Sequence, residues 1–283
     1  MAQLLDGKET AREIREELKT RCAVLKGKGV TPGLAVVLVG NDPASAIYVG
    51  QKEKACGDVG FSSFRYALPA SATEKELLDL IGQLNADTRI HGILVQLPLP
   101  KGLSVDRVIG RIDPGKDVDG FHPLNAGRLA CGLPGIVPCT PKGVMRILER
   151  YAIPLEGRNA VVVGRSNIVG KPMAHLLLGA NMTVTICHSR TPDLGAETRR
   201  ADLIIVAAGR PGIVDGSMVK EGAVVVDVGI HRTAEGIVGD VKFEDVAEKA
   251  SWITPVPGGV GPLTIAMLLE NTLELAERAG RKE

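Results

Sequence analysis

Short apolar runs alternate with amphipathic segments along most of the chain. The run GLAVVLVG at 33–40 is almost continuously apolar, which is typical of a parallel strand covered on both faces. SFRYALP at 63–69 and IHGILVQLPLP at 90–100 predict two further strands, and Pro98 and Pro100 end the latter. Strands that alternate with helices in this way predict an α/β fold.

The helices of this first series carry recognisable end signals. We expect a helix over 43–59, because Asp42 is a good N-cap ahead of a proline and Gly60 is a good stop. Thr73 and Glu76 form a capping box that opens the next helix, TEKELLDLIGQLNAD. Local chemistry therefore predicts where both helices begin.

A second α/β series follows a long connection. Residues 113–139 are rich in Gly and Pro with little periodicity, and they predict a functional loop or a domain connection. Thr140–Pro141 caps a new helix, strands are expected near 159–164, 182–188, 202–209 and 223–229, and a last helix follows WITPVPGGVGP. We expect two α/β domains: a catalytic one at 1–139 to which the C-terminal helix 262–283 returns, and a Rossmann-like, doubly wound parallel-sheet domain at 140–261.

Composition excludes several classes of protein. The net charge is +1, from 34 basic and 33 acidic residues, so no basic field exists to hold a nucleic acid. The five cysteines lack paired spacings and the five histidines are dispersed, so we expect reduced thiols and no metal site. Apolar runs such as 203–208 are too short to span a bilayer, and the N-terminus lacks a signal-peptide pattern. A cytoplasmic protein without membrane or nucleic-acid partners is expected.

The stretch VVVGRSNIVGKPM at 161–173 indicates a nucleotide site. A buried strand meets a turn at Gly164, and Gly170 permits close contact of the following helix, but Ser166 replaces the second glycine of the Rossmann fingerprint. The helix N-terminus offers free N–H groups to a phosphate. An ordinary strand–helix turn that binds nothing remains the alternative on this pattern alone.

The tip of the next strand favours NADP over NAD. NAD enzymes place a carboxylate there for the ribose hydroxyl, whereas this chain has Ser189 and Arg190, with Arg165 beside the first turn. A hydroxyl and cations suit a 2′-phosphate, although Arg190 as a solvated loop residue is the alternative. Ile230 follows a later strand, at the edge where the nicotinamide end is expected.

Candidate catalytic residues lie in the first series. Ser45, Tyr48 and Lys52 share one face of the predicted helix, and the polar Gln96 stands near the end of an apolar strand. Asp119 follows in KDVDGF, where it is equally what a turn before glycine would show. For the Tyr48–Lys52 pair alone, an exposed lysine beside a packed tyrosine remains the alternative.

The segment PVPGGVGPLT forms a rigid loop ahead of the last helix. Pro257, Gly258 and Gly259 would let backbone approach a flat ligand, and Pro262 is expected at the first helical position. An interdomain turn is the other interpretation.

Five stretches in order and at matching spacing carry a family resemblance. SAIYVGQKEKACGDVG, GILVQLPLP, PGKDVDGFHPLNAGRL, VVVGRSNIVGKPM and TPVPGGVGPLTIAMLLENT resemble the bifunctional methylenetetrahydrofolate dehydrogenase/methenyltetrahydrofolate cyclohydrolases, from near residue 5 to near 275. The resemblance implies oxidation of 5,10-methylenetetrahydrofolate by NADP and hydrolysis of the product to 10-formyltetrahydrofolate. It also implies a homodimer that serves purine, histidine and methionine biosynthesis.

The resemblance assigns roles by position. Lys52 would be the central catalytic group, Gln96 would bond Lys52, Tyr48 would pack beside the folate ring and Asp119 would hold the pterin. The nucleotide contacts would be Gly164, Arg165, Ser166, Ser189 and Ile230. From chemistry alone, a buried lysine with a lowered pKa suits the proton transfers of hydrolysis.

Two rival functions would require other residues. A shikimate-type dehydrogenase would need a Lys–Asp catalytic pair and a small polyhydroxy-acid pocket, and the set Tyr48, Lys52 and Gln96 argues against it. A non-catalytic NADP-binding protein would be expected to lose Lys52 or Gln96 while keeping the glycines.

Overall fold

The computed structural model describes residues 1–234 and 236–280. The chain forms two compact units. Unit 1 comprises Met1–Arg12, Leu129–Leu133 and Thr140–Thr264, and unit 2 comprises Glu13–Arg128, Pro134–Cys139 and the segment from Ile265 onward. The first twelve residues therefore group with the second α/β series, and the last helix groups from Ile265 onward with the first series.

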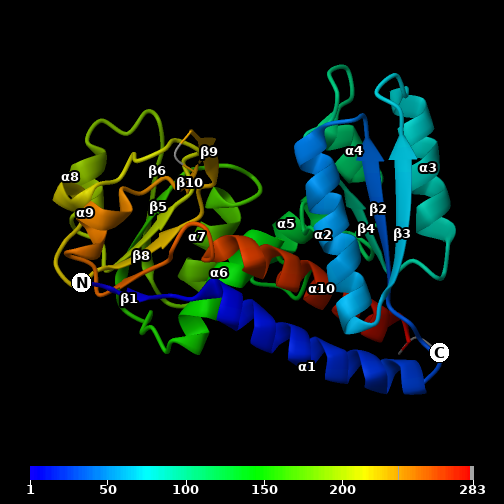
Figure 1. The fold of residues 1–283 in the computed structure, drawn as a ribbon, viewed down its shortest axis with the longest axis horizontal. Coiled ribbons are helices and arrows are strands. Elements are labelled where there is room, and N and C mark those ends of the chain that lie inside the picture. The colour runs from blue at the N-terminus through cyan, green and yellow to red at the C-terminus, as the bar shows by residue number, and fades with distance from the viewer. Residues whose placement is uncertain (235, 281–283) are drawn as a thin grey trace. The chain divides into compact units, whose positions relative to one another are not determined.

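Unit 2 is built on a three-stranded parallel sheet in the order β3-β2-β4. Figure 1 shows α2 on one side of this sheet and α3 on the other. The strands are β2 (Gly33–Val39), β3 (Ser62–Leu68) and β4 (Gly92–Val95), and the helices between and after them are α2 (Pro43–Val59), α3 (Glu74–Ala86), α4 (Val105–Arg111) and α5 (Pro123–Ala130).

The predicted helix ends in unit 2 are confirmed. Asp42 caps α2 by accepting the backbone N–H of Ser45 at 2.8 Å, and Gly60 ends the helix with a left-handed φ of 87°. At α3, Thr73 and Glu76 form the complete capping box. These ends were predictable because each signal and its partner lie within four residues.

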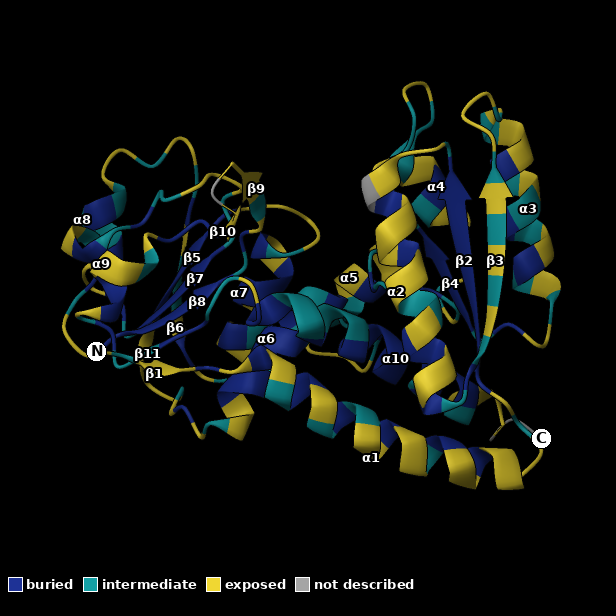
Figure 2. Cartoon of the chain, in the orientation of Figure 1, coloured by how far each residue is buried: buried dark blue, intermediate teal, exposed yellow. Residues whose placement is uncertain are grey.

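The sheet of unit 2 is covered on both faces. Every residue of β2 is buried, and Figure 2 shows this strand dark along its length, whereas β3 alternates between intermediate and exposed residues. Alternate β2 residues point to opposite faces. One face packs Ala35, Val37 and Val39 against α3 and α4 in a cluster with Leu77, Ile81, Leu84, Ile90, Ile93, Val95, Val108 and Ile112.

Unit 1 contains a six-stranded parallel sheet in the order β1-β11-β8-β7-β5-β6. The strands are β1 (Gln3–Leu4), β5 (Asn159–Val163), β6 (Thr183–Cys187), β7 (Leu203–Val206), β8 (Val224–Asp227) and β11 (Trp252–Ile253). The antiparallel pair β9 (His231–Thr233) and β10 (Gly236–Val238) stands apart from it. The helical segments are α7 (Gly170–Gly179), α8 (Leu194–Thr198), a 3₁₀ turn at Gly216–Met218 and α9 (Phe243–Ala247).

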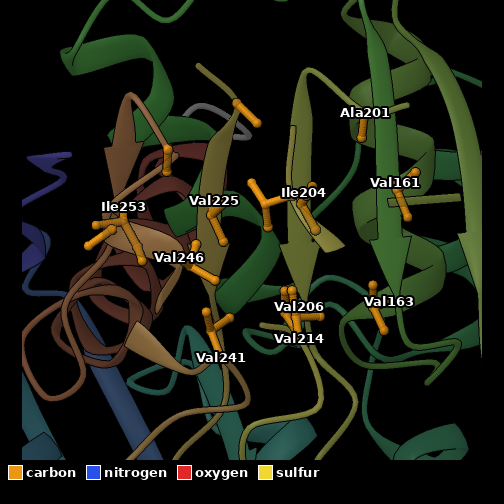
Figure 3. Close-up of a cluster of buried hydrophobic side chains, with 14 of the residues drawn as sticks. Val161, Val163, Ala201, Ile204, Val206, Val214, Val225, Val241, Val246 and Ile253 are labelled. Atoms are coloured by element: carbon orange, nitrogen blue, oxygen red, sulfur yellow. The ribbon is translucent and has the colours of Figure 1, made fainter. Parts of the chain in front are cut away.

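The core of unit 1 lies along the parallel strands. Figure 3 shows Val161 and Val163 from β5, Ile204 and Val206 from β7, and Val225 from β8 in one layer of apolar side chains. Val246 from α9 joins this layer. The four strands predicted for this region and their doubly wound arrangement are confirmed, so the carboxyl ends of β5, β6, β7 and β8 share one edge.

Three helices have residues in both units or at their boundary. They are α1 (Gly7–Gly27), α6 (Cys139–Arg150) and α10 (Val260–Ala279). Because α10 begins at Val260, Pro262 is its third residue, and the prediction of Pro262 at the first position is wrong. Proline is tolerated there because the first turn of a helix needs no N–H donor. Among the described residues, no helix is long and apolar enough to cross a membrane.

Two predicted segments in unit 2 differ from the structure. Residues 113–139 are not an uninterrupted loop, since they contain α5, whose Gly127 and flanking glycines weaken its sequence pattern. Strand β4 ends at Val95, so Gln96 follows the strand instead of lying within it. The Gln96 N–H still bonds the carbonyl of Val37 at 2.8 Å, and Pro98, which lacks an N–H, stops the ladder beyond it.

Candidate active site

Lys52 and Gln96 meet in unit 2. Lys52 lies in the third turn of α2, and its Nζ donates to Gln96 Oε1 at 2.9 Å. The Gln96 amide in turn donates from Nε2 to the carbonyl of Leu97 at 2.7 Å, which fixes the direction of its oxygen. The predicted Lys52–Gln96 contact is therefore present, and a neutral partner restrains the amine.

Burial shifts the pKa values of Lys52 and of its neighbour Asp119. Desolvation lowers the pKa of Lys52, and the nearby Asp119 and Cys139 oppose that shift. Desolvation also raises the pKa of Asp119 to about 6, against the stabilising charge of Lys52 and with a further upward contribution from Asp117. A lysine and a carboxylate with pKa values displaced toward neutrality are characteristic of proton-transfer sites.

Tyr48 lies one helical turn before Lys52. It is 41% exposed, so one part of its ring is available to a ligand. Ser45, Tyr48 and Lys52 all lie in α2, so their spacing keeps them on one side of the helix, and Ser45 is its buried member. Ser45 lies in the first turn, where its N–H is capped by Asp42.

The turn after β5 in unit 1 depends on two glycines. Gly164 has a φ of 134°, and a Cβ on it would overlap the carbonyl of Ala207. A Cβ on Gly170 would overlap the carbonyl of Gly164. Both glycines are therefore required for the close approach of α7 to the turn.

Ser166, which replaces the second glycine of the Rossmann fingerprint, has a structural role in the turn. Its Oγ accepts the N–H groups of Val169 at 3.1 Å and Gly170 at 3.3 Å, so it caps the start of α7 from within the turn. The hydroxyl hydrogen remains a donor. The turn therefore forms with a serine, whose hydroxyl accepts two backbone N–H groups, at the place of the second glycine.

We expect Gly164→Ala to destabilise the protein by about 2 kcal/mol or more, because the new Cβ meets backbone and the φ is unfavourable for alanine. Urea unfolding measures this loss. Gly179→Ala, at the end of α7 in open space, is the matched control and should be neutral or slightly stabilising. Equal midpoints for the two variants would contradict this account of the turn.

The tip of β6 presents cationic and hydroxyl groups. The N–H of His188 donates to Thr191 Oγ1 at 2.9 Å, and the N–H of Arg190 donates to His188 Nδ1 at 3.1 Å, which closes a tight turn. Ser189 and Arg190 are exposed on it. The next acid along the chain, Asp193, caps α8 by accepting the N–H of Ala196. This tip fits a 2′-phosphate better than a ribose hydroxyl.

A buried carboxylate that sequence patterns did not reveal joins the loops after β7 and β8. Asp240 is fully buried; its Oδ2 accepts the N–H groups of Ala208 at 2.6 Å and Gly209 at 2.8 Å. Its Oδ1 lies 2.6 Å from His231 Nε2. Ile230, the residue before this histidine, is 49% exposed at the sheet edge. Asp240 thereby holds the two loops next to the predicted nicotinamide position.

The loop at 255–259 also belongs to unit 1. Gly258 has a φ of 111°, and its carbonyl accepts the N–H of Lys8 at 3.1 Å. A Cβ on Gly7 would overlap the carbonyl of Gly259, so the N-terminal segment packs directly on this loop. Pro257, Gly258 and Gly259 therefore lie in a different unit from Lys52. Among the described residues, no cluster of three or more His, Cys, Asp or Glu side chains could hold a metal ion.

These features define a class of protein. One unit holds a desolvated lysine restrained by an amide beside a carboxylate, and the other is a Rossmann-like unit with a glycine-dependent turn between β5 and α7. This combination is typical of a nucleotide-dependent oxidoreductase that also transfers protons.

Comparison with known proteins identifies the family. Residues 5–119 match the catalytic domain of tetrahydrofolate dehydrogenase/cyclohydrolase, and residues 138–280 match its NAD(P)-binding domain. The bifunctional protein FolD of Desulfovibrio desulfuricans is 58% identical over 96% of this chain and 97% of its own length. The chain belongs to the tetrahydrofolate dehydrogenase/cyclohydrolase family and is a bifunctional enzyme of that family.

Solved structures agree with this assignment. The bifunctional FolD dehydrogenase/cyclohydrolase of Campylobacter jejuni is 56% identical, with a TM-score of 0.97, over 98% of this chain and 99% of its own. The Trypanosoma brucei dehydrogenase-cyclohydrolase, solved with NADP cofactor and an inhibitor, is 40% identical with a TM-score of 0.94, over 99% of both chains. The resemblance seen in the sequence is confirmed, and the shikimate-type and non-catalytic alternatives are set aside.

Proposed function

We propose that this chain oxidises 5,10-methylenetetrahydrofolate with NADP and then hydrolyses the methenyl product to 10-formyltetrahydrofolate, with Lys52 as the central proton-transfer group. The observation that carries the proposal is the 2.9 Å bond from Lys52 Nζ to Gln96 Oε1, next to Asp119. Family membership supplies the reaction, and this geometry supports the assignment of residues to its steps.

The oxidation needs positioning more than acid–base chemistry. When bound, NADP accepts a hydride from the carbon that bridges two folate nitrogens, and a cation delocalised over those nitrogens remains. Asp119 is suited to hold the amino-pyrimidine edge of the pterin through two parallel N–H bonds. Tyr48 offers its partly exposed ring to the flat folate.

The hydrolysis needs proton transfer. The neutral Lys52 amine takes a proton from water as the water oxygen bonds the methenyl carbon. The resulting Lys52 ammonium then gives the proton to the departing folate nitrogen as the bond between that nitrogen and the carbon breaks. The proton of the hydroxyl newly bonded to the carbon leaves to solvent, which completes the formyl group. The lowered pKa of Lys52 supports this role, because more of the amine is neutral near pH 7 than for an exposed lysine. Gln96 restrains the amine without adding a charge that would favour its protonation.

The residues of unit 1 fit NADP. Gly164, Arg165 and Ser166 would hold the pyrophosphate at the start of α7, where the helix dipole favours an anion. Ser189 and Arg190 would hold the 2′-phosphate, and Ile230 would lie against the nicotinamide. The absence of an acid between His188 and Pro192 supports NADP over NAD.

The pH dependence of folate use tests the role of Asp119. We expect kcat/KM for methylenetetrahydrofolate to fall as the pH drops through about 6, because the carboxylate must be ionised to accept N–H bonds and burial raises its pKa to about 6. An ordinary aspartate, with a pKa of about 4, would leave the profile flat in this range. In Asp119→Asn the limb near pH 6 should disappear from the pH–rate profile, whereas Asp113→Asn should keep it. Persistence of the limb in Asp119→Asn would contradict the assignment.

We further propose that the chain acts in the cytoplasm as a homodimer and uses no nucleic-acid or membrane partner. All five cysteines are free thiols, which supports a reducing compartment. The family resemblance supports the dimer, and the near-neutral charge supports the absence of a nucleic-acid partner. Light scattering on the eluting protein measures the dimer directly, and a monomer mass at micromolar concentration would overturn that part of the proposal.

A further inference from the structure

The two residues before Asp119, Asp117 and Val118, are both buried. Asp117, only 2% exposed, accepts four hydrogen bonds through its carboxylate. Its Oδ1 accepts the N–H groups of Gly120 at 3.0 Å and Phe121 at 3.3 Å. Its Oδ2 accepts the His122 N–H at 2.8 Å and the Asn125 side-chain amide at 2.9 Å. One charged group therefore closes the turn that contains Asp119 and joins it to the start of α5.

Val118, between the two aspartates, is anchored from the opposite side. Its carbonyl accepts the Asn271 Nδ2 of α10 at 2.8 Å and the Cys139 thiol at 3.3 Å. Its side chain packs so closely on Gly92 that a Cβ there would overlap it. Asp119 is thus the partly exposed residue of a turn whose flanking atoms are fixed in the interior of unit 2.

The same segment is in register with the strand that leads to Gln96. The Ile93 N–H in β4 donates to the carbonyl of Lys116 at 2.7 Å, and Ile93 and Asp117 form a parallel bridge. Gln96, the partner of Lys52, follows β4 directly. The backbone at 116–117 therefore relates the position of Asp119 to the position of the Lys52–Gln96 pair.

We propose that Asp117 is a positioning residue for folate recognition, whose buried carboxylate fixes the turn so that Asp119 meets the pterin in the required geometry. This inference rests on the proposed function, in which Asp119 holds the pterin. Two parallel N–H bonds tolerate little displacement of the accepting carboxylate. A small misplacement of a positioning group is sufficient to impair substrate use. The four donors to the Asp117 carboxylate belong to the turn and to α5, so Asp117 acts on the folate through Asp119.

A double-mutant cycle tests this inference. Asp117→Asn keeps the shape of the side chain but replaces one oxygen by an amide that cannot accept, so two donors lose their partner. We expect the KM for methylenetetrahydrofolate to rise about tenfold while the KM for NADP changes less than about twofold. In an Asp119→Asn background, Asp117→Asn should add less than about twofold to the folate KM, since its effect is transmitted through Asp119.

Asp113→Asn is the matched control. Asp113 also accepts a backbone N–H in this segment, from Gly115 at 2.7 Å, but it lies outside the turn that carries Asp119. The folate KM of Asp113→Asn should stay at the wild-type value. If Asp117→Asn accumulates unfolded protein, Asn125→Ala serves instead, because it removes only one of the four donors and should raise the folate KM in the same direction by a smaller factor.

The outcomes separate this inference from the proposed function. The positioning role of Asp117 would be overturned if the fold-increases in folate KM of Asp117→Asn and Asp119→Asn multiplied in the double variant. Equal increases in the KM values for folate and NADP in Asp117→Asn would also overturn it. Neither result would affect the proposed function. An unchanged folate KM in Asp119→Asn would remove the assigned role of Asp119 and the inference with it. A wild-type chain without activity on methylenetetrahydrofolate would refute the proposed function itself.

Discussion

Replacing Lys52 with alanine is expected to lower the rate of 5,10-methenyltetrahydrofolate hydrolysis by about 100-fold to 10,000-fold, the usual contribution of a positioned acid–base group. The side chain of Lys52 is desolvated and bonded to Gln96, so no water can take its place with the same proton affinity and direction. Hydride transfer needs no proton from Lys52, yet we expect it to fall strongly as well, since the amine also helps define the folate position. Loss of the methenyl absorbance measures hydrolysis, and NADPH absorbance measures oxidation.

Lys54→Ala is the matched control for Lys52→Ala. Lys54 lies on the same helix two residues later and is exposed, so both activities should stay within about twofold of wild type. Retained NADP affinity in Lys52→Ala would show that unit 1 is unaffected. Hydrolysis at the wild-type rate in Lys52→Ala would end the assignment of Lys52 as the proton-transfer group.

Replacing Arg190 with alanine is expected to weaken NADP binding by about tenfold to 100-fold, the range for loss of a charge-assisted bond to phosphate. NAD lacks the 2′-phosphate, so its affinity should change by less than about twofold. The turn from His188 to Thr191 is closed by backbone N–H groups and the side chains of His188 and Thr191, so the substitution should leave its shape intact. Titration of each nucleotide against the purified variant gives the two dissociation constants.

Arg200→Ala controls for a general loss of positive charge from unit 1. Arg200 is exposed and lies 3.6 Å from Glu197, away from the tip of β6. Its removal should affect neither nucleotide. Equal losses of NADP and NAD affinity in Arg190→Ala would show that the 2′-phosphate is recognised by other residues.

Elements with short-range signals were predictable from the sequence. The α2 helix has its cap, its first-turn proline and its glycine stop within the segment itself, and the capping box of α3 spans only four residues. The short strands β1 and β11 were not predicted, because two residues carry no periodicity and their identity depends on pairing across the chain. Helix α5 was missed because Gly127 weakens the helical pattern of its eight residues.

The candidate site was predictable only in part. Lys52 and Gln96 stood out because a polar amide at the end of an apolar strand requires a partner, and the structure provides it. Asp240 and Asn271 gave no comparable signal. Asp240 accepts from Ala208 and Gly209, which lie 31 to 32 residues away, and Asn271 bonds groups 132 to 153 residues away, so only the fold brings these groups together. The identity of the folate substrate came from family resemblance, because hydride donation leaves no characteristic acid or base in the sequence.

A single reaction of the purified chain with methylenetetrahydrofolate and NADP in water labelled with ¹⁸O shows whether one chain performs both oxidation and hydrolysis. NADPH and 10-formyltetrahydrofolate should form in equal amounts once the methenyl intermediate is consumed, and mass spectrometry should find the label in the formyl group. Formation of NADPH with a methenyl product that decays only at the rate of the enzyme-free buffer would contradict the account, as would a reaction that yields no NADPH.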